Sequence, residues 1–228
     1  MKPVHKIFLT AFAIATCCGF ITQAEGEEMK QPEKIILPKP NLKGAMSVEE
    51  CIQKRRSVRS FSSKPLAAEE VSQLLWATQG ITDARRGLRA APSAGALYPL
   101  EIYLVKGDGV FYYDIENHAI IKNSGGDMRS ALSGAALGQA SIKEAPASIV
   151  ICAVRSRTTA KYGGRGNRYV EIEAGHAAEN LHLQAVALGL ASVPVGAFDD
   201  NQVKKVLNLP SGTEPLYIIP AGHPKTPF

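Results

Sequence analysis

Apolar residues recur at the spacing of an α-helix in several stretches of the chain. Ser47 followed by Glu50 has the form of a capping box, so the pattern predicts a helix from Val48 to about Arg56. Further helices are expected over 67–78, 127–137 and 199–207. The polar, proline-rich residues 25–46 are interpreted as an extended N-terminal arm.

The longest helix candidate spans 168–189. Its main apolar stripe consists of Val170, Ala174, Ala177, Leu181, Ala185 and Leu188. Ile172 and Leu183 add apolar surface on other sides. A helix that is apolar on more than one side is buried on more than one side. We therefore expect a central helix with a second subunit against one of its faces.

Strand patterns lie between these helices. Strands are predicted at 101–106, 110–114, 119–122, 148–154 and 216–219. Glu116-Asn117 is the expected turn of a hairpin, and 82–99 is loop-like because glycine and proline interrupt it. Strands and helices intermingle without regular βαβ alternation, so the sequence predicts an α+β fold in one domain over 47–228.

The first 24 residues have the form of a secretory signal peptide. Lys2 and Lys6 precede an apolar run over 7–21, and small residues lead up to a cleavage site after Ala24. The chain is therefore expected to be exported by a Sec-type signal. An uncleaved membrane anchor is the alternative, and a lipoprotein would require acylation of one of the leader cysteines.

Composition excludes some classes of function. Of the 228 residues, 45% are hydrophobic and 21% charged, which is typical of a globular protein. Two of the 26 basic residues lie in the first 24 positions, where no acid stands, so 24 basic residues face 21 acidic ones in the remainder. This small excess gives no reason to expect nucleic acid as a partner.

Cysteine and histidine usage predicts no metal site. Outside the leader, Cys51 and Cys152 stand alone, and we interpret them as buried core thiols rather than a disulfide. The histidines are scattered, with no spacing typical of metal ligands.

A basic segment, Lys54-Arg55-Arg56-Ser57-Val58-Arg59, ends the first helix. Its guanidinium groups and hydroxyl suit a phosphate. The alternative is a basic helix C-terminus favoured by the helix dipole.

Two segments of small residues follow later in the chain. Residues 91–99 form a Gly/Pro-bounded loop in which small side chains let a flat ligand approach the backbone, unless the loop is only a tight connection. Residues 191–198 offer backbone N–H groups to a planar heterocycle, unless they are only an apolar strand.

The order of these motifs resembles that of the nitroreductase family of FMN oxidoreductases. The motif sequences are similar to those of its SagB-type branch, which includes azoline dehydrogenases. The resemblance covers about 36–224. It rests on RRSVRSF at 55–61, PSAGALYP at 92–99, GVFYYD at 109–114, KYGGRGNRY at 161–169, EAGHAAENLHLQA at 173–185 and GLASVPVGAF at 189–198.

This resemblance implies a mixed central sheet flanked by helices in an intertwined homodimer with FMN at the subunit interface. Arg55, Arg56, Ser57 and Arg59 would lie at the flavin phosphate and ring edge. Pro92, Ser93 and Ala94 would line the flavin. Pro194, Val195, Gly196 and Ala197 would pass beside the reactive edge of the ring. Many members carry Asn where this chain has Ala96, so one polar contact to the ring is missing.

The resemblance leaves two chemistries open. One is reduction of a quinone or nitroaromatic with NAD(P)H or another electron donor. The other is dehydrogenation of an azoline in a modified peptide, for which Lys161 and Tyr162 match the family's catalytic pair. A glycine-rich loop is the alternative setting for those two residues. A flavin-free scaffold is a third possibility, although the arginines expected at the flavin are all present.

Overall fold

The computed structural model describes residues 33–226, so the predicted leader and the first part of the predicted arm lie outside the described residues. The main sheet has seven strands in the order β1-β6-β5-β4-β7-β9-β8. Their bounds are Lys34–Ile36 (β1), Leu100–Lys106 (β4), Gly109–Asp114 (β5), Ala119–Gly125 (β6), Ala147–Ala153 (β7), Ala191–Ser192 (β8) and Glu214–Gly222 (β9). A small separate ribbon pairs β2 (Ile81–Asp83) with β3 (Leu88–Arg89).

The expected α+β class is confirmed, but the expectation of a mixed sheet is wrong within the described residues. Every ladder of the sheet is antiparallel. The reason is connectivity: β4, β5 and β6 follow one another through tight turns that reverse the chain, and β7 and β9 add to that meander in the same alternating sense. The one parallel pairing described is the isolated bridge between Ser57 and Ser192.

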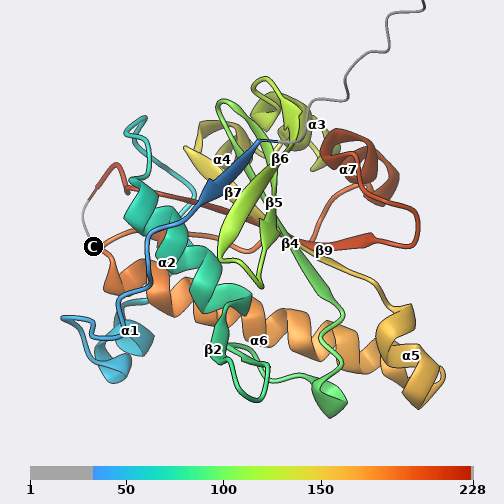
Figure 1. The fold of residues 1–228 in the computed structure, drawn as a ribbon. Coiled ribbons are helices and arrows are strands. Elements are labelled where there is room, and N and C mark those ends of the chain that lie inside the picture. The colour runs from blue at the N-terminus through green and yellow to red at the C-terminus, as the bar shows by residue number, and fades with distance from the viewer. Residues whose placement is uncertain (1–32, 227–228) are drawn as a thin grey trace, which may run out of the picture. The chain divides into compact units, whose positions relative to one another are not determined.

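Seven α-helices accompany the sheet in the described part of the chain (Figure 1). They are α1 (Val48–Lys54), α2 (Ala68–Gln79), α3 (Arg129–Ala135), α4 (Ala140–Glu144), α5 (Ser156–Tyr162), α6 (Arg165–Ala187) and α7 (Asp200–Leu207). The predicted capping box is present, because Glu50 N–H donates to Ser47 Oγ and Ser47 N–H donates to Glu50 Oε2. Helix α1 ends at Lys54, and Arg55 is its C-cap.

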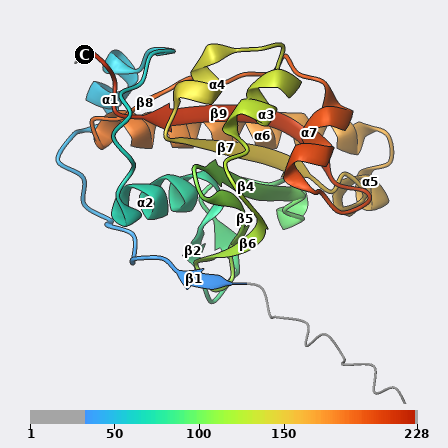
Figure 2. The same ribbon diagram turned by 90° about the horizontal axis from the view of Figure 1, so that it is seen from above.

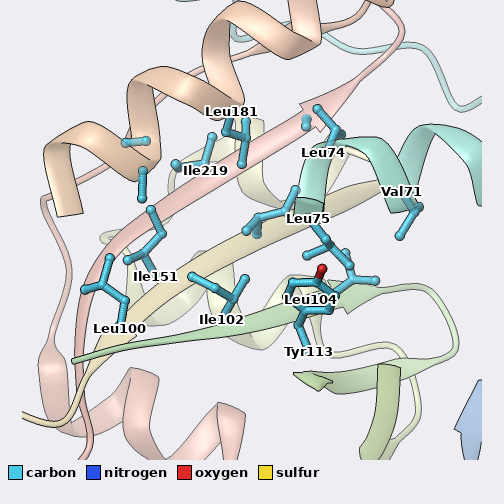
Figure 3. Close-up of a cluster of buried hydrophobic side chains, with 14 of the residues drawn as sticks. Val71, Leu74, Leu75, Leu100, Ile102, Leu104, Tyr113, Ile151, Leu181 and Ile219 are labelled. Atoms are coloured by element: carbon cyan, nitrogen blue, oxygen red, sulfur yellow. The ribbon is translucent and has the colours of Figure 1, made fainter. Parts of the chain in front are cut away.

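The helices cover both faces of the sheet (Figures 1 and 2). Successive side chains of a strand point to opposite faces. Leu100, Ile102 and Leu104 of β4 therefore pack with α2 and α6, as Figure 3 shows. Tyr103 and Val105 of the same strand pack with α3, α4 and α7. The two hydrophobic clusters are thus separated by the sheet itself.

Helix α6 is the long central helix that its pattern predicts. The expected stripe faces the sheet, and Val170, Ala177, Leu181 and Ala185 are inaccessible to solvent. On the opposite face Ile172 keeps 47% of its surface exposed. In a single chain Ile172 is therefore uncovered, whereas Leu183 is half-buried.

The structure contains several short elements that the sequence pattern does not predict. The region expected as a loop at 82–99 contains part of β2, all of β3 and a 3₁₀ turn at Ala94–Ala96. Residues 34–36 of the expected arm pair with β6 as a strand. Cys51 and Cys152 are free and buried, as expected. None of the helices among the described residues is long and apolar enough to cross a membrane.

Candidate functional site

The basic segment and the segment after α6 lie side by side. The chain leaves α1 at Arg55, and Ser57 then forms a parallel bridge with Ser192 of β8. Val58 N–H donates to the Ser192 carbonyl oxygen at 3.1 Å. Two of the predicted flavin segments, far apart in sequence, are therefore joined through their backbones.

The arginines of this segment differ in what they contact. Arg55 lies beside α6, with its Nε 3.8 Å from Glu179 Oε1. Arg56 Nη1 donates to the carbonyl oxygens of Gln53 and Arg55 at 2.8 and 2.7 Å, so it caps the C-terminus of α1. Arg59 is exposed. The helix-end interpretation thus applies to Arg56, while the guanidinium groups of Arg55 and Arg59 have no hydrogen bond to the described residues.

The segment 194–197 offers fewer donors than the sequence suggests. Pro194 has no N–H, and Val195 exchanges two backbone hydrogen bonds with Ile218 of β9, at 2.8 and 3.0 Å. Gly196 and Ala197 follow on the exposed side. The N–H groups of these two residues are the ones that remain for a ligand.

The loop at 92–98 is anchored on α6. Ser93 Oγ donates to Glu173 Oε2 at 2.5 Å and accepts from the Tyr98 N–H at 2.9 Å. At its end, Arg157 Nη1 donates to the Tyr98 carbonyl oxygen at 3.1 Å. Pro92 is exposed, and Ser93 and Ala94 are half-buried.

Lys161 and Tyr162 end helix α5 and face this loop. A Cβ placed on Gly95 would lie 2.8 Å from Tyr162 Oη and 3.1 Å from Lys161 Nζ. The interpretation of Lys161 and Tyr162 as part of a glycine-rich loop is therefore wrong. The glycines begin after them, with Gly163 capping α5 at a positive φ of 56°.

Two buried polar side chains of α6, which were not predicted from the sequence, contact the candidate segments. One contacts the 92–98 loop, and the other contacts Ser192. Glu173 holds Ser93, and His182 Nδ1 is 2.7 Å from Ser192 Oγ. Burial raises the pKa of Glu173, against hydrogen bonds from Ser93 and Gln79 and the charge of Arg89. Burial, with Arg55 nearby, lowers the pKa of His182 to about 4, so this imidazole is neutral at physiological pH.

The candidate residues therefore form two groups along α6. The 92–98 loop lies at Glu173, and the joined segments that contain Ser57 and Ser192 lie at His182. Glu173 and His182 are nine residues apart, roughly 14 Å along the helix axis. Cavities of about 630 and 500 Å³ lie elsewhere, and no predicted flavin residue lines either one. Among the described residues no cluster of three His, Cys, Asp or Glu side chains is placed to hold a metal ion. In a single chain the candidate site is open surface.

Comparison with known proteins gives a consistent result. The profile of the nitroreductase family matches residues 52–223. A protein of Methanocaldococcus jannaschii named as a candidate nitroreductase is 43% identical over 183 residues, which cover 78% of this chain and 91% of that protein. A solved structure from Ralstonia eutropha, also named as a candidate nitroreductase, matches with a TM-score of 0.77 at 27% identity over 85% of this chain and 90% of that one.

Two more distant relatives carry specific names. The FMN reductase [NAD(P)H] of Bacillus subtilis is 26% identical over 183 residues, 74% of this chain and 62% of that protein. A microcin B17-processing protein of Escherichia coli is 27% identical over 136 residues, 55% of this chain and 50% of that protein. The family match, the first relative and the shared fold lead to one conclusion: the chain belongs to the nitroreductase family of oxidoreductases.

Proposed function

We propose that the protein is an FMN-dependent oxidoreductase that reduces a quinone-like or nitroaromatic acceptor. The observation that carries this proposal is the backbone pairing between Ser57 and Ser192. It joins the segment that carries Arg55 and Arg59 to the segment that runs on to the exposed backbone of Gly196 and Ala197. The charged donors proposed for a phosphate and the N–H donors proposed for a ring edge therefore lie on two segments that are held together through their backbones.

The chemistry of this surface fits the cofactor. His182 Nε2 is buried and has no hydrogen-bond partner among the described residues, although Arg55 is close enough to act on its pKa. A bound water or ligand is one explanation of an unpartnered buried polar atom, and an anionic ligand at this place would also pair with Arg55. FMN supplies hydride transfer through its N5 atom. The task of the chain is to hold the phosphate with Arg55 and Arg59 and to leave one face of the ring accessible.

FMN binding by the purified protein tests this function. We expect a yellow protein, and titration of flavin-free protein with FMN, FAD and riboflavin should show a clear preference for FMN. The reason is that one arginine cluster provides one phosphate site, which riboflavin leaves empty. A colourless protein that does not bind added FMN would overturn the oxidoreductase proposal and favour the flavin-free scaffold.

The homodimer is part of this proposal, because the candidate site of one chain is open. Gly175 lies mid-way along the exposed face of α6, and a Cβ placed there meets no atom within 4 Å. Glycine within a helix costs about 1 kcal/mol relative to alanine. Close approach of a second subunit explains why a glycine stands there, and Ile172 on the same face supplies apolar surface.

Gly175→Leu should therefore separate the dimer and lower flavin retention. Sedimentation at micromolar concentration is the measurement, with Gly134→Leu on α3 as the matched control, because Gly134 is also helical, exposed and free of neighbours. In the free chain both substitutions favour the helix. A Gly175→Leu protein that remains dimeric would place the interface on another face.

A second candidate function is dehydrogenation of an azoline in a modified peptide, as the SagB-type motifs suggest. The contact of Lys161 and Tyr162 with Gly95 favours it, because it brings a base and a hydroxyl to the loop expected to line the flavin. The likeness to a microcin B17-processing protein is consistent with this alternative.

Export by a Sec-type signal peptide, or retention as an N-terminal anchor, stays a prediction. An exported enzyme would be separated from cytosolic NAD(P)H. The electron donor would then be a different reduced compound, whereas an anchored enzyme facing the cytoplasm would use NAD(P)H.

A further inference from the structure

The loop from Pro92 to Tyr98 is held in a backbone conformation that needs support. Gly95, Ala96 and Tyr98 have φ values of 64°, 53° and 45°. Left-handed backbone is accessible to glycine but strained for residues that carry a Cβ. Such strain persists only where the surroundings over-determine the conformation, and it concentrates at functional sites.

A chain of hydrogen bonds connects the loop to one buried carboxyl group, that of Glu173. Tyr98 N–H donates to Ser93 Oγ, and Ser93 Oγ donates in turn to Glu173 Oε2. Gln79 Nε2 donates to the other oxygen, Glu173 Oε1, at 3.2 Å. Both oxygens of Glu173 thus accept a hydrogen bond. Through Ser93 this carboxylate fastens residue 93 and residue 98 together.

Packing alone does not explain a glutamate at this position. Glu173 is 2% exposed and stands next to the apolar stripe of α6, where Val170 and Ala177 are fully buried. Burying a carboxylate is costly unless it is hydrogen-bonded. An apolar residue here would lack the two acceptors for Ser93 and Gln79 and the charge that interacts with Arg89.

We propose that Glu173 is a positioning residue that fixes the flavin-facing conformation of the 92–98 loop. This inference rests on the proposed function for the identity of the ligand. Because the Ser93 hydroxyl donates its hydrogen bond to Glu173, it is not a free donor, and the loop would face a bound flavin with the backbone of Ala94 and Gly95. The same anchor keeps Gly95 against Lys161 and Tyr162.

Three variants separate the anchor from the charge. Glu173→Ala removes both acceptors. Glu173→Gln keeps an acceptor for Ser93. Gln79 Oε1 is a buried atom without a partner in the described structure. If the Gln79 amide turns over, the new amide N–H₂ of the variant is able to donate to that oxygen. Glu171→Gln is the control, because Glu171 lies two residues away on α6 and is exposed.

Hydrogen exchange of the Ala96 and Tyr98 amides, measured in flavin-free protein, reports the loop directly, since both amides are hydrogen-bonded to Ser93. In Glu173→Ala we expect exchange at least tenfold faster at these two amides, unchanged exchange in β4, and FMN binding at least tenfold weaker. Glu173→Gln should stay within threefold of the wild type in both measurements, and Glu171→Gln should match the wild type.

Wild-type exchange and wild-type FMN affinity in Glu173→Ala would overturn the proposal. Equal acceleration in β4 and in the loop would also overturn it, because that result means general destabilisation. If Glu173→Ala does not fold, Ser93→Ala removes the same link from the other end. The Ala96 amide then decides, because its acceptor, the Ser93 carbonyl oxygen, is still present in that variant. A wild-type protein that binds no FMN would refute the proposed function, while the exchange measurement still tests the anchor.

Discussion

Replacing Arg55 with alanine should weaken FMN binding by about 2–3 kcal/mol, roughly 30- to 150-fold in the dissociation constant. Arg55 lies half-buried at the C-cap of α1, where the chain turns to pair with β8. Its contact with Glu179 is long, 3.8 Å, so the guanidinium is not committed to a strong internal partner. Loss of a charge-assisted bond to phosphate therefore accounts for most of the expected effect. Flavin fluorescence titration measures it.

Arg56 provides a matched control in the neighbouring position. Its guanidinium donates to two carbonyl oxygens at the end of α1, so Arg56→Ala should lower helix stability more than flavin affinity. Arg85→Ala, an exposed arginine in the turn between β2 and β3, should change neither. Equal FMN affinity in wild type and Arg55→Ala would place the phosphate elsewhere, with Arg59 as the next residue to replace.

The larger elements could be predicted because their signals are local and repeated. The helix expected at 168–189 is α6 at Arg165–Ala187, and the expected hairpin is β5 and β6. Their patterns extend over enough residues for the period to be read. Helix α4 has five residues, too few to show a helical period. Helix α5 contains two threonines and precedes three glycines within four residues, and its position is fixed by tertiary contacts, in particular between Arg157 and Glu101.

The candidate site was predictable as segments but not as an arrangement. Each flavin segment has a recognisable composition, whereas the pairing of Ser57 with Ser192 joins positions that have no local signal for each other. The pairing sets which segments lie together. The Val195 N–H is not available to a ligand, because it donates to the Ile218 carbonyl oxygen. The roles of Glu173 and His182 cannot be predicted from the sequence, because a single polar residue beside an apolar stripe does not change the helical pattern. Their role appears only when Ser93 and Ser192 are seen to contact them.

Lys161→Ala should separate the two candidate chemistries. Removing a proton from a carbon next to a heteroatom requires a base, and a positioned base contributes typically 10²–10⁴-fold. Azoline oxidation gives the ring a double bond as a hydride and a proton leave; the flavin would accept the hydride, and Lys161 would be the residue that takes the proton. Hydride transfer from a nicotinamide needs no such base. The variant is therefore expected to keep quinone reduction and, if the enzyme acts on azolines, to lose at least a hundredfold of peptide oxidation.

The geometry makes this a test of chemistry rather than of folding. Lys161 is exposed in the last turn of α5, and its Nζ lies near Gly95 at the surface, so truncation removes little buried contact. Lys205→Ala, an exposed lysine in the last turn of α7, is the matched control and should affect neither activity. Loss of quinone reduction together with peptide oxidation would show that Lys161 supports the flavin loop instead. If azoline oxidation occurs in the wild type and survives in the variant, Lys161 is not the base, and the peptide function loses the contact that favours it.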